Sequence, residues 1–242
     1  MNALVMCGGR GTRLRSAVGD TEKPLVEVGD RPLIDRVVDA VWGANIGDDD
    51  SGELERKPVY AAVSPATPET AAHLRDDDRV QCLETSGEGY VADLTAALNH
   101  VGQPAVTVTA DLPFLSAGHV ERASRVADGD PVTICVPASL TASLGVSAET
   151  VIERDEGDEH NEHKENAVVP TGLNVVAGGT DRVVVWSDER LAFNVNRPSD
   201  LARAREFAEN DRPATTVSHR NHSVVSTNHE NIRLYVLETF RR

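Results

Sequence analysis

A glycine-rich segment near the N-terminus carries the most distinctive chemistry in this sequence. Residues 8–13 read GGRGTR, directly follow a short apolar run, and precede Lys23-Pro24-Leu25. Glycines after a strand let the backbone approach a ligand closely, and their N–H groups can form a cradle for an anion. Arg13 and Lys23 would add positive charge beside the same anion. The spacing matches neither the P-loop nor the dinucleotide-binding fingerprint, so we interpret the segment as a phosphate-binding loop of another kind.

Two more polar segments follow predicted strands. Residues 85–90, TSGEGY, lie between a strand and a helix, where small residues with free N–H groups suit a base, a ribose or a phosphate. Asp111 comes directly after an apolar run, and a carboxylate at such a strand end is well placed to hold Mg²⁺ on a triphosphate. An alternative role for Asp111 is to cap the turn before Pro113.

Two later segments add amide side chains. Residues 170–176, PTGLNVV, place a glycine and an asparagine before an apolar strand, where they could line the pocket of a second substrate. Asn194 and Asn196 are two residues apart on an extended stretch, so they point the same way and could reach a metal or a phosphate. Alternatively, Asn194 and Asn196 form a turn or cap the helix that begins near Pro198, and the sequence leaves both possibilities open.

The elements that position these residues alternate along the chain. Apolar runs and helical periodicity predict strands at residues 2–7, 59–64, 80–83, 105–110, 132–136, 173–176 and 182–186, and helices at residues 32–43, 67–74, 90–101, 116–127 and 198–207. This alternation predicts an α/β, Rossmann-like fold, a mostly parallel twisted sheet with helices on both faces. Ligands bind at the carboxyl edge of such sheets, where the polar segments above would meet. Thr67 is predicted to cap the second helix, with Pro68 at its first position.

The predicted domain covers residues 1–208, and residues 209–242 form a C-terminal extension whose role the sequence does not reveal. Residues 47–57 and 153–165 are acidic and lack apolar periodicity, so we interpret them as surface loops. His160 and His163 lie in the second loop, and we interpret them as exposed rather than metal-binding. Asp93 and Asp128 are predicted to be surface residues of helices.

Composition excludes several classes of protein. The 242 residues include 24 Lys and Arg against 39 Asp and Glu, a net charge of −15, and so acidic a surface repels nucleic acid. No apolar run reaches the ~18 residues that a membrane span requires, and the N-terminal residues do not resemble a secretory signal. Three scattered cysteines (Cys7, Cys82 and Cys135) form no disulfide framework. We therefore expect a reduced protein in the cytoplasm.

The charge pattern also predicts a dependence on salt. Only three of the basic residues are lysine, and aromatic residues make up 4% of the chain. High acidity with few lysines and aromatics is typical of a protein from a salt-rich cytoplasm, where a Debye length of ~3 Å at 1 M salt screens the self-repulsion. A GC-rich genome, which replaces Lys with Arg, is the alternative. We expect the fold to be lost when salt is removed, and a native circular dichroism spectrum in dilute buffer would contradict this expectation.

The motifs together resemble a known group of enzymes. Residues 8–13 with Lys23-Pro24-Leu25 resemble the nucleotidyltransferase superfamily of sugar-nucleotide and molybdopterin guanylyl and cytidylyl enzymes. Residues 85–94, 170–176 and 193–196 resemble the archaeal adenosylcobinamide-phosphate guanylyltransferase family, which makes a precursor of the nucleotide loop of coenzyme B12. The match runs in order over about residues 1–208, and the acidic loops and the C-terminal extension depart from it.

This resemblance implies a reaction and a role for each motif. The reaction is transfer of GMP from GTP to adenosylcobinamide phosphate with release of pyrophosphate, in the presence of Mg²⁺, by a protein of the nucleotidyltransferase fold. The implied catalytic residues are Arg13, Lys23 and Asp111; the implied nucleotide-binding residues are Gly8, Gly9, Gly11, Thr12, Arg13, Lys23, Thr85, Ser86, Gly87 and Gly89; the implied acceptor-binding residues are Gly172, Leu173 and Asn174; and the implied metal ligands are Asp111, Asn196 and Asn194. Its partners would be GTP and a corrinoid phosphate, without nucleic acid or a membrane span, and a homodimer is left open.

Other functions compete with this one. The same fold could act on another acceptor, such as a molybdopterin, a phospholactate or a sugar phosphate. A non-catalytic sensor of guanine nucleotides would not need Arg13, Lys23 and Asp111 together. A glycosyltransferase would commonly use an Asp-x-Asp metal pair, whereas Leu112-Pro113 follows Asp111. Because the chain has no P-loop, we expect no kinase activity on cobinamide that lacks its phosphate.

Overall fold

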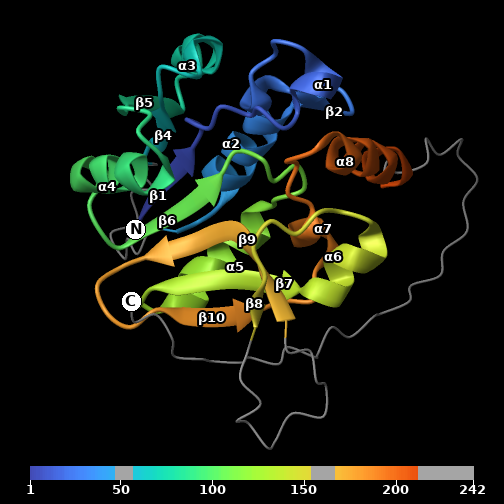
Figure 1. The fold of residues 1–242 in the computed structure, drawn as a ribbon. Helices are drawn as coiled ribbons and strands as arrows, with labels where there is room; N and C mark the ends of the chain where they lie inside the picture. The colour runs from blue at the N-terminus through green and yellow to red at the C-terminus, as the bar shows by residue number, and fades with distance from the viewer. Residues whose placement is uncertain (47–56, 154–166, 212–242) are drawn as a thin grey trace, which may run out of the picture.

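A computed structural model describes residues 1–46, 57–153 and 167–211 of the chain (Figure 1). The acidic loops predicted at residues 47–57 and 153–165, with His160 and His163, and the extension after residue 208 lie mostly or wholly outside the described residues. No helix in these described ranges is long and apolar enough to span a membrane.

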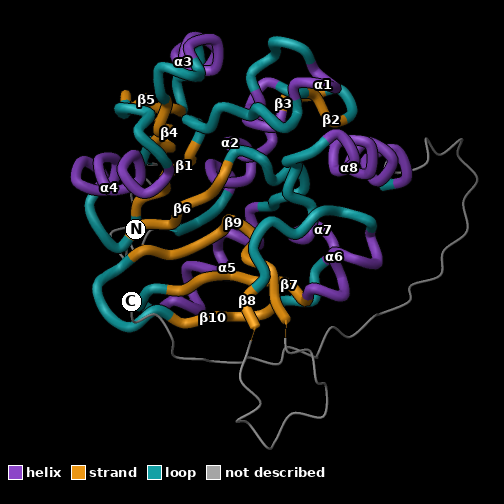
Figure 2. Tube along the Cα trace, viewed as in Figure 1, coloured by secondary structure: helices purple, strands orange, loops and turns teal. Residues whose placement is uncertain are grey.

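The core of the molecule is one large sheet (Figures 1 and 2). Its strands are β1 (Asn2–Met6), β4 (Val59–Val63), β5 (Val80–Glu84), β6 (Ala105–Thr109), β7 (Val132–Pro137), β8 (Ile152–Glu153), β9 (Ala167–Val176) and β10 (Arg182–Val185). Their order is β10-β7-β9-β6-β1-β4-β5, with β8 paired to β9. The pairs within β5-β4-β1-β6 and the pair β10-β7 are parallel. The predicted mostly parallel sheet is therefore confirmed.

Strand β9 is the exception, because it runs antiparallel to both of its long neighbours, β6 and β7. The sequence indicated a strand here but not its direction. Residues 177–181 alone join β9 to β10, and a connection this short cannot make the crossover of a dozen or more residues that two parallel strands require. Because β10 is parallel to β7, β9 must run in the opposite direction.

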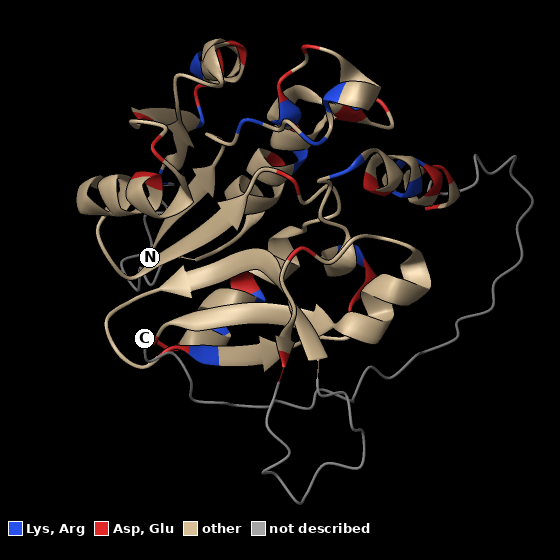
Figure 3. Ribbon diagram, in the orientation of Figure 1, with Lys and Arg blue, Asp and Glu red and all other residues tan. Residues whose placement is uncertain are grey.

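Helices cover both faces of the sheet, as predicted (Figure 1). Helices α2 (Leu33–Gly43), α3 (Pro68–Arg75) and α5 (Ala117–Ala127) pack on one face, in a buried cluster that includes Val5 of β1. Helix α4 (Tyr90–Val101) packs on the other face, in a cluster with Leu4 and Met6. Successive residues of β1 thus serve opposite faces, which is why this strand reads as a continuous apolar run. Charged residues lie mostly on the helices and loops, and the strands are largely uncharged (Figure 3).

The shorter elements were not predicted, because they are too short to show periodicity. They are α1 (Arg15–Val18), the 3₁₀ turn at Lys23–Leu25, the hairpin of β2 (Glu27–Val28) and β3 (Arg31–Pro32), α6 (Ala138–Leu144) and α7 (Glu189–Ala192). Helix α8 (Pro198–Asn210) is longer than predicted. It packs with the hairpin and the 193–195 segment in a third buried cluster that includes Val28, Phe193 and Leu201.

The predicted cap of α3 is wrong in one respect. The hydroxyl of Thr67 accepts from the Ser64 N–H at 3.2 Å instead of capping the helix. The carboxylate of Glu22, far away in sequence, accepts hydrogen bonds from the N–H groups of Glu69 and Thr70 at 2.8 and 2.7 Å. A negative charge at a helix N-terminus is stabilising, and this contact anchors the chain just before Lys23.

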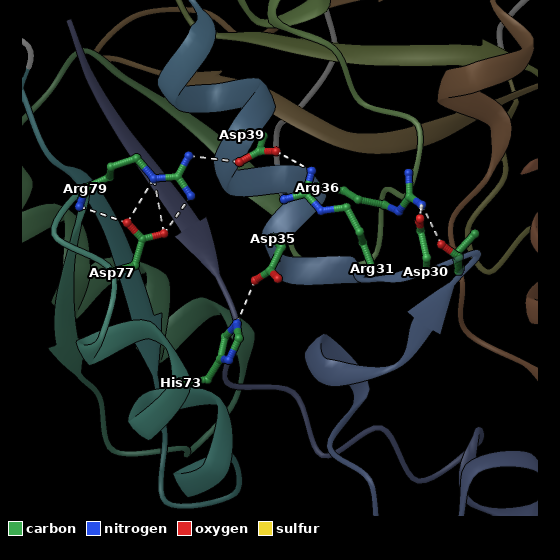
Figure 4. A network of polar contacts seen from close by, with 9 residues as sticks. Asp30, Arg31, Asp35, Arg36, Asp39, His73, Asp77 and Arg79 are labelled. Carbon is green, nitrogen blue, oxygen red and sulfur yellow. Dashed lines mark hydrogen bonds and ion pairs between the residues drawn. The ribbon is translucent and has the colours of Figure 1, made fainter. Parts of the chain in front are cut away.

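An ion-pair network joins α2 to the segment between α3 and β5 (Figure 4). Arg79 pairs with Asp77 at 2.7 Å and with Asp39 at 2.9 Å, and Arg31 also pairs with Asp39. The hydrogen bonds from Arg79 hold the pKa of Asp77 below its ordinary value. Burial by itself would raise the pKa of Asp39, but hydrogen bonds from Arg31 and Arg79 outweigh burial and lower it.

This network predicts how stability responds to acid. Because both aspartates have a lower pKa in the folded protein than the ordinary value of about 3.9 for an unfolded chain, their contribution is present above about pH 4 and is lost as the pH falls through the folded-state pKa. We expect the free energy of unfolding, measured with denaturant at constant high salt, to fall below pH 4. Arg79→Gln should make this fall less steep, and an unchanged slope in that variant would contradict the assignment.

Candidate functional site

A cavity of about 400 Å³ opens at the carboxyl ends of β1 and β6. Six residues singled out from the sequence line it: Gly8, Gly9, Lys23, Gly87, Gly89 and Asp111. The parallel strands bring these distant segments to one edge of the sheet, as expected for this class of fold. The predicted phosphate-binding loop, the second glycine loop and the predicted metal ligand therefore face one space.

A second cavity of about 390 Å³ adjoins the first. Gly172, Asn174, Asn194 and Asn196 line it, and Asp111 lines both cavities. The two asparagines alternate with Phe193 and Val195, which are buried in the cluster under α8. Because side chains of an extended segment alternate in direction, burial of the apolar pair turns the two amides toward the cavity.

Lys23 lies at the junction of the two cavities. Its ammonium group donates hydrogen bonds to Asp111 Oδ2 at 2.5 Å and to Asn196 Oδ1. The side chains of Lys23 and Asp111 are only 15% and 12% exposed, so water screens this ion pair weakly. Asn196 Nδ2 in turn donates to Asn194 Oδ1 at 2.5 Å. The structure therefore brings together the lysine, the aspartate and both asparagines that the sequence singled out.

The same oxygens suit a divalent cation. Asp111 Oδ1 is buried and has no hydrogen-bond partner among the described residues. Asp111 Oδ2 and Asn196 Oδ1 already converge on one positive charge, that of Lys23. Within residues 1–46, 57–153 and 167–211 no group of three or more His, Cys, Asp or Glu side chains is arranged to hold a metal. One carboxylate supplemented by amide and substrate oxygens is a common way of holding Mg²⁺, so these residues fit that ion.

The structure shows why residue 11 of the first loop is a glycine. Its φ is +57°, and a Cβ at this position would lie 2.8 Å from Lys23 Cβ. Only glycine both adopts this conformation readily and allows so close an approach. Gly11 therefore positions Lys23. By contrast, a Cβ on Gly9 would meet no protein atom within 4 Å.

Asp93 is a residue of the candidate site whose burial the sequence analysis predicted wrongly. We predicted a surface helix residue, but Asp93 is 5% exposed and lines the first cavity. Its carboxylate accepts the Gly87 N–H at 2.9 Å and so holds the second glycine loop against the first turn of α4. The spacing of Asp93 from Gly89 placed it in that first turn, which is the signal that could have revealed its role.

Several predicted residues lie elsewhere. Arg13 pairs with Glu149, is 56% exposed and lines neither cavity, and Thr12 is also exposed. The hydroxyl of Thr85 donates to the Val63 carbonyl at 2.9 Å, and exposed Ser86 lines neither cavity. Leu173 is fully buried in the core, so its side chain does not face an acceptor.

Other lining residues were not predicted. Arg10 lines the first cavity, and Tyr90 lines both. Partial burial and the negative charge of Asp111 raise the pKa of Tyr90, so its hydroxyl is neutral at neutral pH. Burial likewise raises the pKa of Cys7, which keeps this cavity-lining thiol protonated and makes it a poor nucleophile.

Asp200 holds together the backbone segments that line the second cavity. This carboxylate is fully buried and accepts hydrogen bonds from the N–H and hydroxyl of Ser147 and from the N–H groups of Asn196 and Arg197, at 2.8–3.1 Å. It thereby ties the Ser147 segment, the asparagine segment and the start of α8 together.

Removal of this carboxylate should be costly. Asp200→Ala leaves several buried donors without a partner, so we expect a loss of about 3 kcal/mol in the free energy of unfolding. Binding in the second cavity should weaken more than binding in the first, because Ser147 and Asn196 line the second cavity. Ser199→Ala, at an exposed neighbour on α8, is the matched control. A variant as stable as Ser199→Ala would contradict this role.

Two adjoining cavities around a glycine loop, a lysine and an aspartate lie at the carboxyl edge of a mostly parallel sheet, an arrangement that suits an enzyme that transfers nucleotidyl groups. The family model of the MobA-like NTP transferase domain matches residues 3–144, and the chain belongs to this family. It is therefore a nucleotidyltransferase.

Two curated proteins and one solved structure are similar to this chain. The chain is 29% identical over 217 residues to the adenosylcobinamide-phosphate guanylyltransferase of Methanocaldococcus jannaschii, covering 87% of this chain and 99% of that protein. It is also 29% identical over 161 residues to the N-acetylmuramate alpha-1-phosphate uridylyltransferase of Caulobacter vibrioides, covering 59% of this chain and 60% of that protein. Among solved structures, a CMP:2-keto-3-deoxy-manno-octonic acid synthetase in complex with CTP matches with a TM-score of 0.61 and 13% identity, covering 87% of this chain and 99% of that one. This last similarity concerns the fold alone.

Proposed function

We propose that this nucleotidyltransferase moves GMP from GTP to adenosylcobinamide phosphate and releases pyrophosphate. The observation that carries the proposal is the pair of adjoining cavities with Asp111 in their shared wall. One cavity suits the nucleotide and the other the acceptor. The nearly full-length similarity to the guanylyltransferase of Methanocaldococcus jannaschii supports the choice of GTP and of a corrinoid acceptor.

In the proposed reaction, an oxygen of the acceptor phosphate attacks the α-phosphorus of GTP. The new P–O bond forms as the bond between the α-phosphate and the β-phosphate breaks, and pyrophosphate leaves with the electron pair. The nucleophile is already an anion at neutral pH, so the reaction needs no strong general base. The barrier comes from bringing anions together, so positioning and charge neutralisation dominate catalysis.

Lys23 supplies the charge at the junction of the cavities. Its ammonium group lies beside Asp111 and Asn196, within a site where low exposure strengthens electrostatic effects. When substrate phosphates enter, Lys23 can donate hydrogen bonds to them in place of these side chains. Asp111, with Asn196 and Asn194, would hold Mg²⁺, which when bound supplies further positive charge to the phosphate oxygens.

The glycine loops hold the nucleotide in this proposal. Gly8 and Gly9 bring backbone close to the phosphates, and Gly87 and Gly89 line the part of the same cavity left for the ribose or base. Arg13 would reach the phosphates by leaving Glu149, which its exposure allows. Gly172 and Asn174 face the acceptor.

Pyrophosphate release tests the proposal. The protein is assayed in molar KCl with Mg²⁺, adenosylcobinamide phosphate and either GTP, ATP, CTP or UTP. We expect release with GTP and little with the other nucleotides. Lack of release while GTP still binds would show that the acceptor is wrong, and release with a sugar phosphate or a molybdopterin would identify the rival acceptor.

A further inference from the structure

We propose that Asp93 determines which base this enzyme binds, by accepting hydrogen bonds from the N1–H and N2–H groups of guanine. The inference rests on the proposed function for the binding of a nucleoside triphosphate in the first cavity. It adds a residue of this chain that selects the base, whereas the choice of GTP above is supported by a relative.

The carboxylate of Asp93 lies between the two glycine loops. The residue is 5% exposed and lines the first cavity. Its Oδ1 atom accepts the Gly87 N–H at 2.9 Å, which fixes the side chain on the second loop. Its Oδ2 atom faces the first loop, since a Cβ on Gly8 would lie 3.5 Å from it. A carboxylate held in this way presents its second oxygen at a defined place in the wall of the cavity.

The second oxygen of Asp93 is open to a ligand. Oδ2 has no hydrogen-bond or ion-pair partner among residues 1–46, 57–153 and 167–211, whereas Oδ1 has one. Unlike Asp111 Oδ1, it is not sealed from solvent. A buried carboxylate is costly unless donors satisfy it. A ligand that brings N–H groups to Oδ2 therefore makes hydrogen bonds that the described residues leave unmade.

The order of the strands places Asp93 at the end of the first cavity away from the proposed phosphate site. Strands β6, β1 and β4 are neighbours in that order (Figure 1). Asp111 follows β6 and pairs with Lys23, where the phosphates bind in the proposed function. Asp93 contacts Gly87, and a Cβ on Gly87 would lie 3.4 Å from the Cβ of Ser64, which follows β4. Two strand spacings, about 10 Å, separate the two ends.

This separation and the charge of the carboxylate favour the base over the other parts of the nucleotide. The base lies farther from the α-phosphate than the ribose does, and Asp93 would repel a phosphate. Guanine presents two adjacent donors, N1–H and N2–H, whereas adenine presents an acceptor, its unprotonated N1 atom, at the same position. A carboxylate beside that acceptor is repulsive, so Asp93 would both attract guanine and exclude adenine.

The variant Asp93→Asn separates base selection from positioning of the loop. Asparagine keeps the size of the side chain and an oxygen that can accept the Gly87 N–H, but it puts an N–H donor in place of Oδ2. We expect the affinity for GTP to fall about 30-fold, as when a hydrogen bond to a charged group is lost. Affinity for XTP, whose base carries a carbonyl oxygen in place of the N2 amino group, should rise about tenfold because that oxygen accepts from asparagine. Affinity for ATP should not fall.

Isothermal titration calorimetry in molar KCl with Mg²⁺, without an acceptor, measures these affinities in the absence of turnover. In the native protein, ITP, which lacks the N2 amino group, should bind about tenfold more weakly than GTP. Asp128→Asn, at the exposed end of α5, is the control for the loss of one negative charge and should bind each nucleotide as the native protein does. Glu88→Gln tests the exposed carboxylate that also lines the first cavity, and it should keep the preference for GTP over ATP.

The outcomes separate this inference from the proposed function. A switch from GTP to XTP in Asp93→Asn supports the inference and shows that the variant is folded. If GMP is nevertheless not transferred to adenosylcobinamide phosphate by the native protein, only the proposed reaction is overturned. Equal losses for GTP, ATP and XTP would mean that Asp93 only holds the Gly87 loop or contacts the ribose, which overturns the inference and leaves the reaction.

Three further results would also overturn the inference. They are native GTP affinity in Asp93→Asn, a loss of the preference for GTP in Glu88→Gln, and a native protein that binds GTP, ITP and ATP equally. In the last case, pyrophosphate release with ATP as well as GTP would overturn the choice of GTP too.

Discussion

Replacing Lys23 with alanine should lower kcat roughly 10²–10³-fold, the range seen when one transition-state donor is removed from a shielded site. The ammonium group sits between Asp111 and Asn196 at the junction of the two cavities. Charge on the α-phosphate and on the leaving pyrophosphate would develop beside it. Steady-state pyrophosphate release measures the effect, and the Michaelis constant for GTP should change less than kcat.

A matched lysine provides the control for this prediction. Lys57 is exposed, lies just before the amino end of β4 and lines neither cavity. Lys57→Ala should therefore keep native kinetics. Lys23→Ala also leaves the buried Asp111 without its cation, which is destabilising, so circular dichroism must show that the variant is folded. Native kinetics in a folded Lys23→Ala would remove the central catalytic assignment.

Replacing Asp111 with asparagine should lower kcat by a similar factor, roughly 10²–10³-fold, because it removes the negative charge that would hold Mg²⁺ in the proposed reaction. The change keeps the size and shape of the side chain. The concentration of Mg²⁺ needed for half-maximal activity should rise, since the buried Oδ1 atom without a partner is the best ligand that the described residues offer. A titration of activity with Mg²⁺ measures both effects.

Asp128→Asn serves as the control for the loss of one negative charge. Asp128 is exposed at the end of α5 in a left-handed conformation that asparagine also adopts. It should leave the Mg²⁺ titration unchanged. An Asp111→Asn enzyme with a native Mg²⁺ requirement would show that the cation is held elsewhere.

The comparison of sequence and structure is most informative at two buried carboxylates: Asp93, which we predicted at the surface, and Asp200, for which we made no prediction. Asp93 and Asp200 have charged side chains in helices, and composition alone assigns such residues to the surface. Both are buried because each satisfies backbone N–H groups of a distant or neighbouring loop: Gly87 in one case, and Ser147, Asn196 and Arg197 in the other. These contacts depend on where loops meet in space, and no periodicity in a single segment reports them.

The partner of Arg13 also could not be read from the sequence. Its position in the glycine-rich loop predicted a phosphate contact, yet it pairs with Glu149, a residue of the second cavity wall. A long, exposed guanidinium side chain can reach several partners. Which one it contacts depends on the nearest available carboxylate or phosphate, and the sequence cannot state that distance.

The sequence by itself determined the alternation of strands and helices, the mostly parallel sheet and several of the residues that meet at its edge, Lys23, Asp111 and Asn196 among them. It could do so because strand and helix periodicity are local, and because parallel strands with right-handed crossovers place their carboxyl ends together. Only the tertiary structure decided the direction of β9, the burial of Asp93 and Asp200, the contact of Glu22 with α3 and the placement of Tyr90 in the wall between two cavities. Most of these depend on contacts between segments far apart in the chain, such as Ser147 with Asp200 and Glu22 with Thr70, and the contact of Asp93 with Gly87 depends on how a loop folds back on a helix.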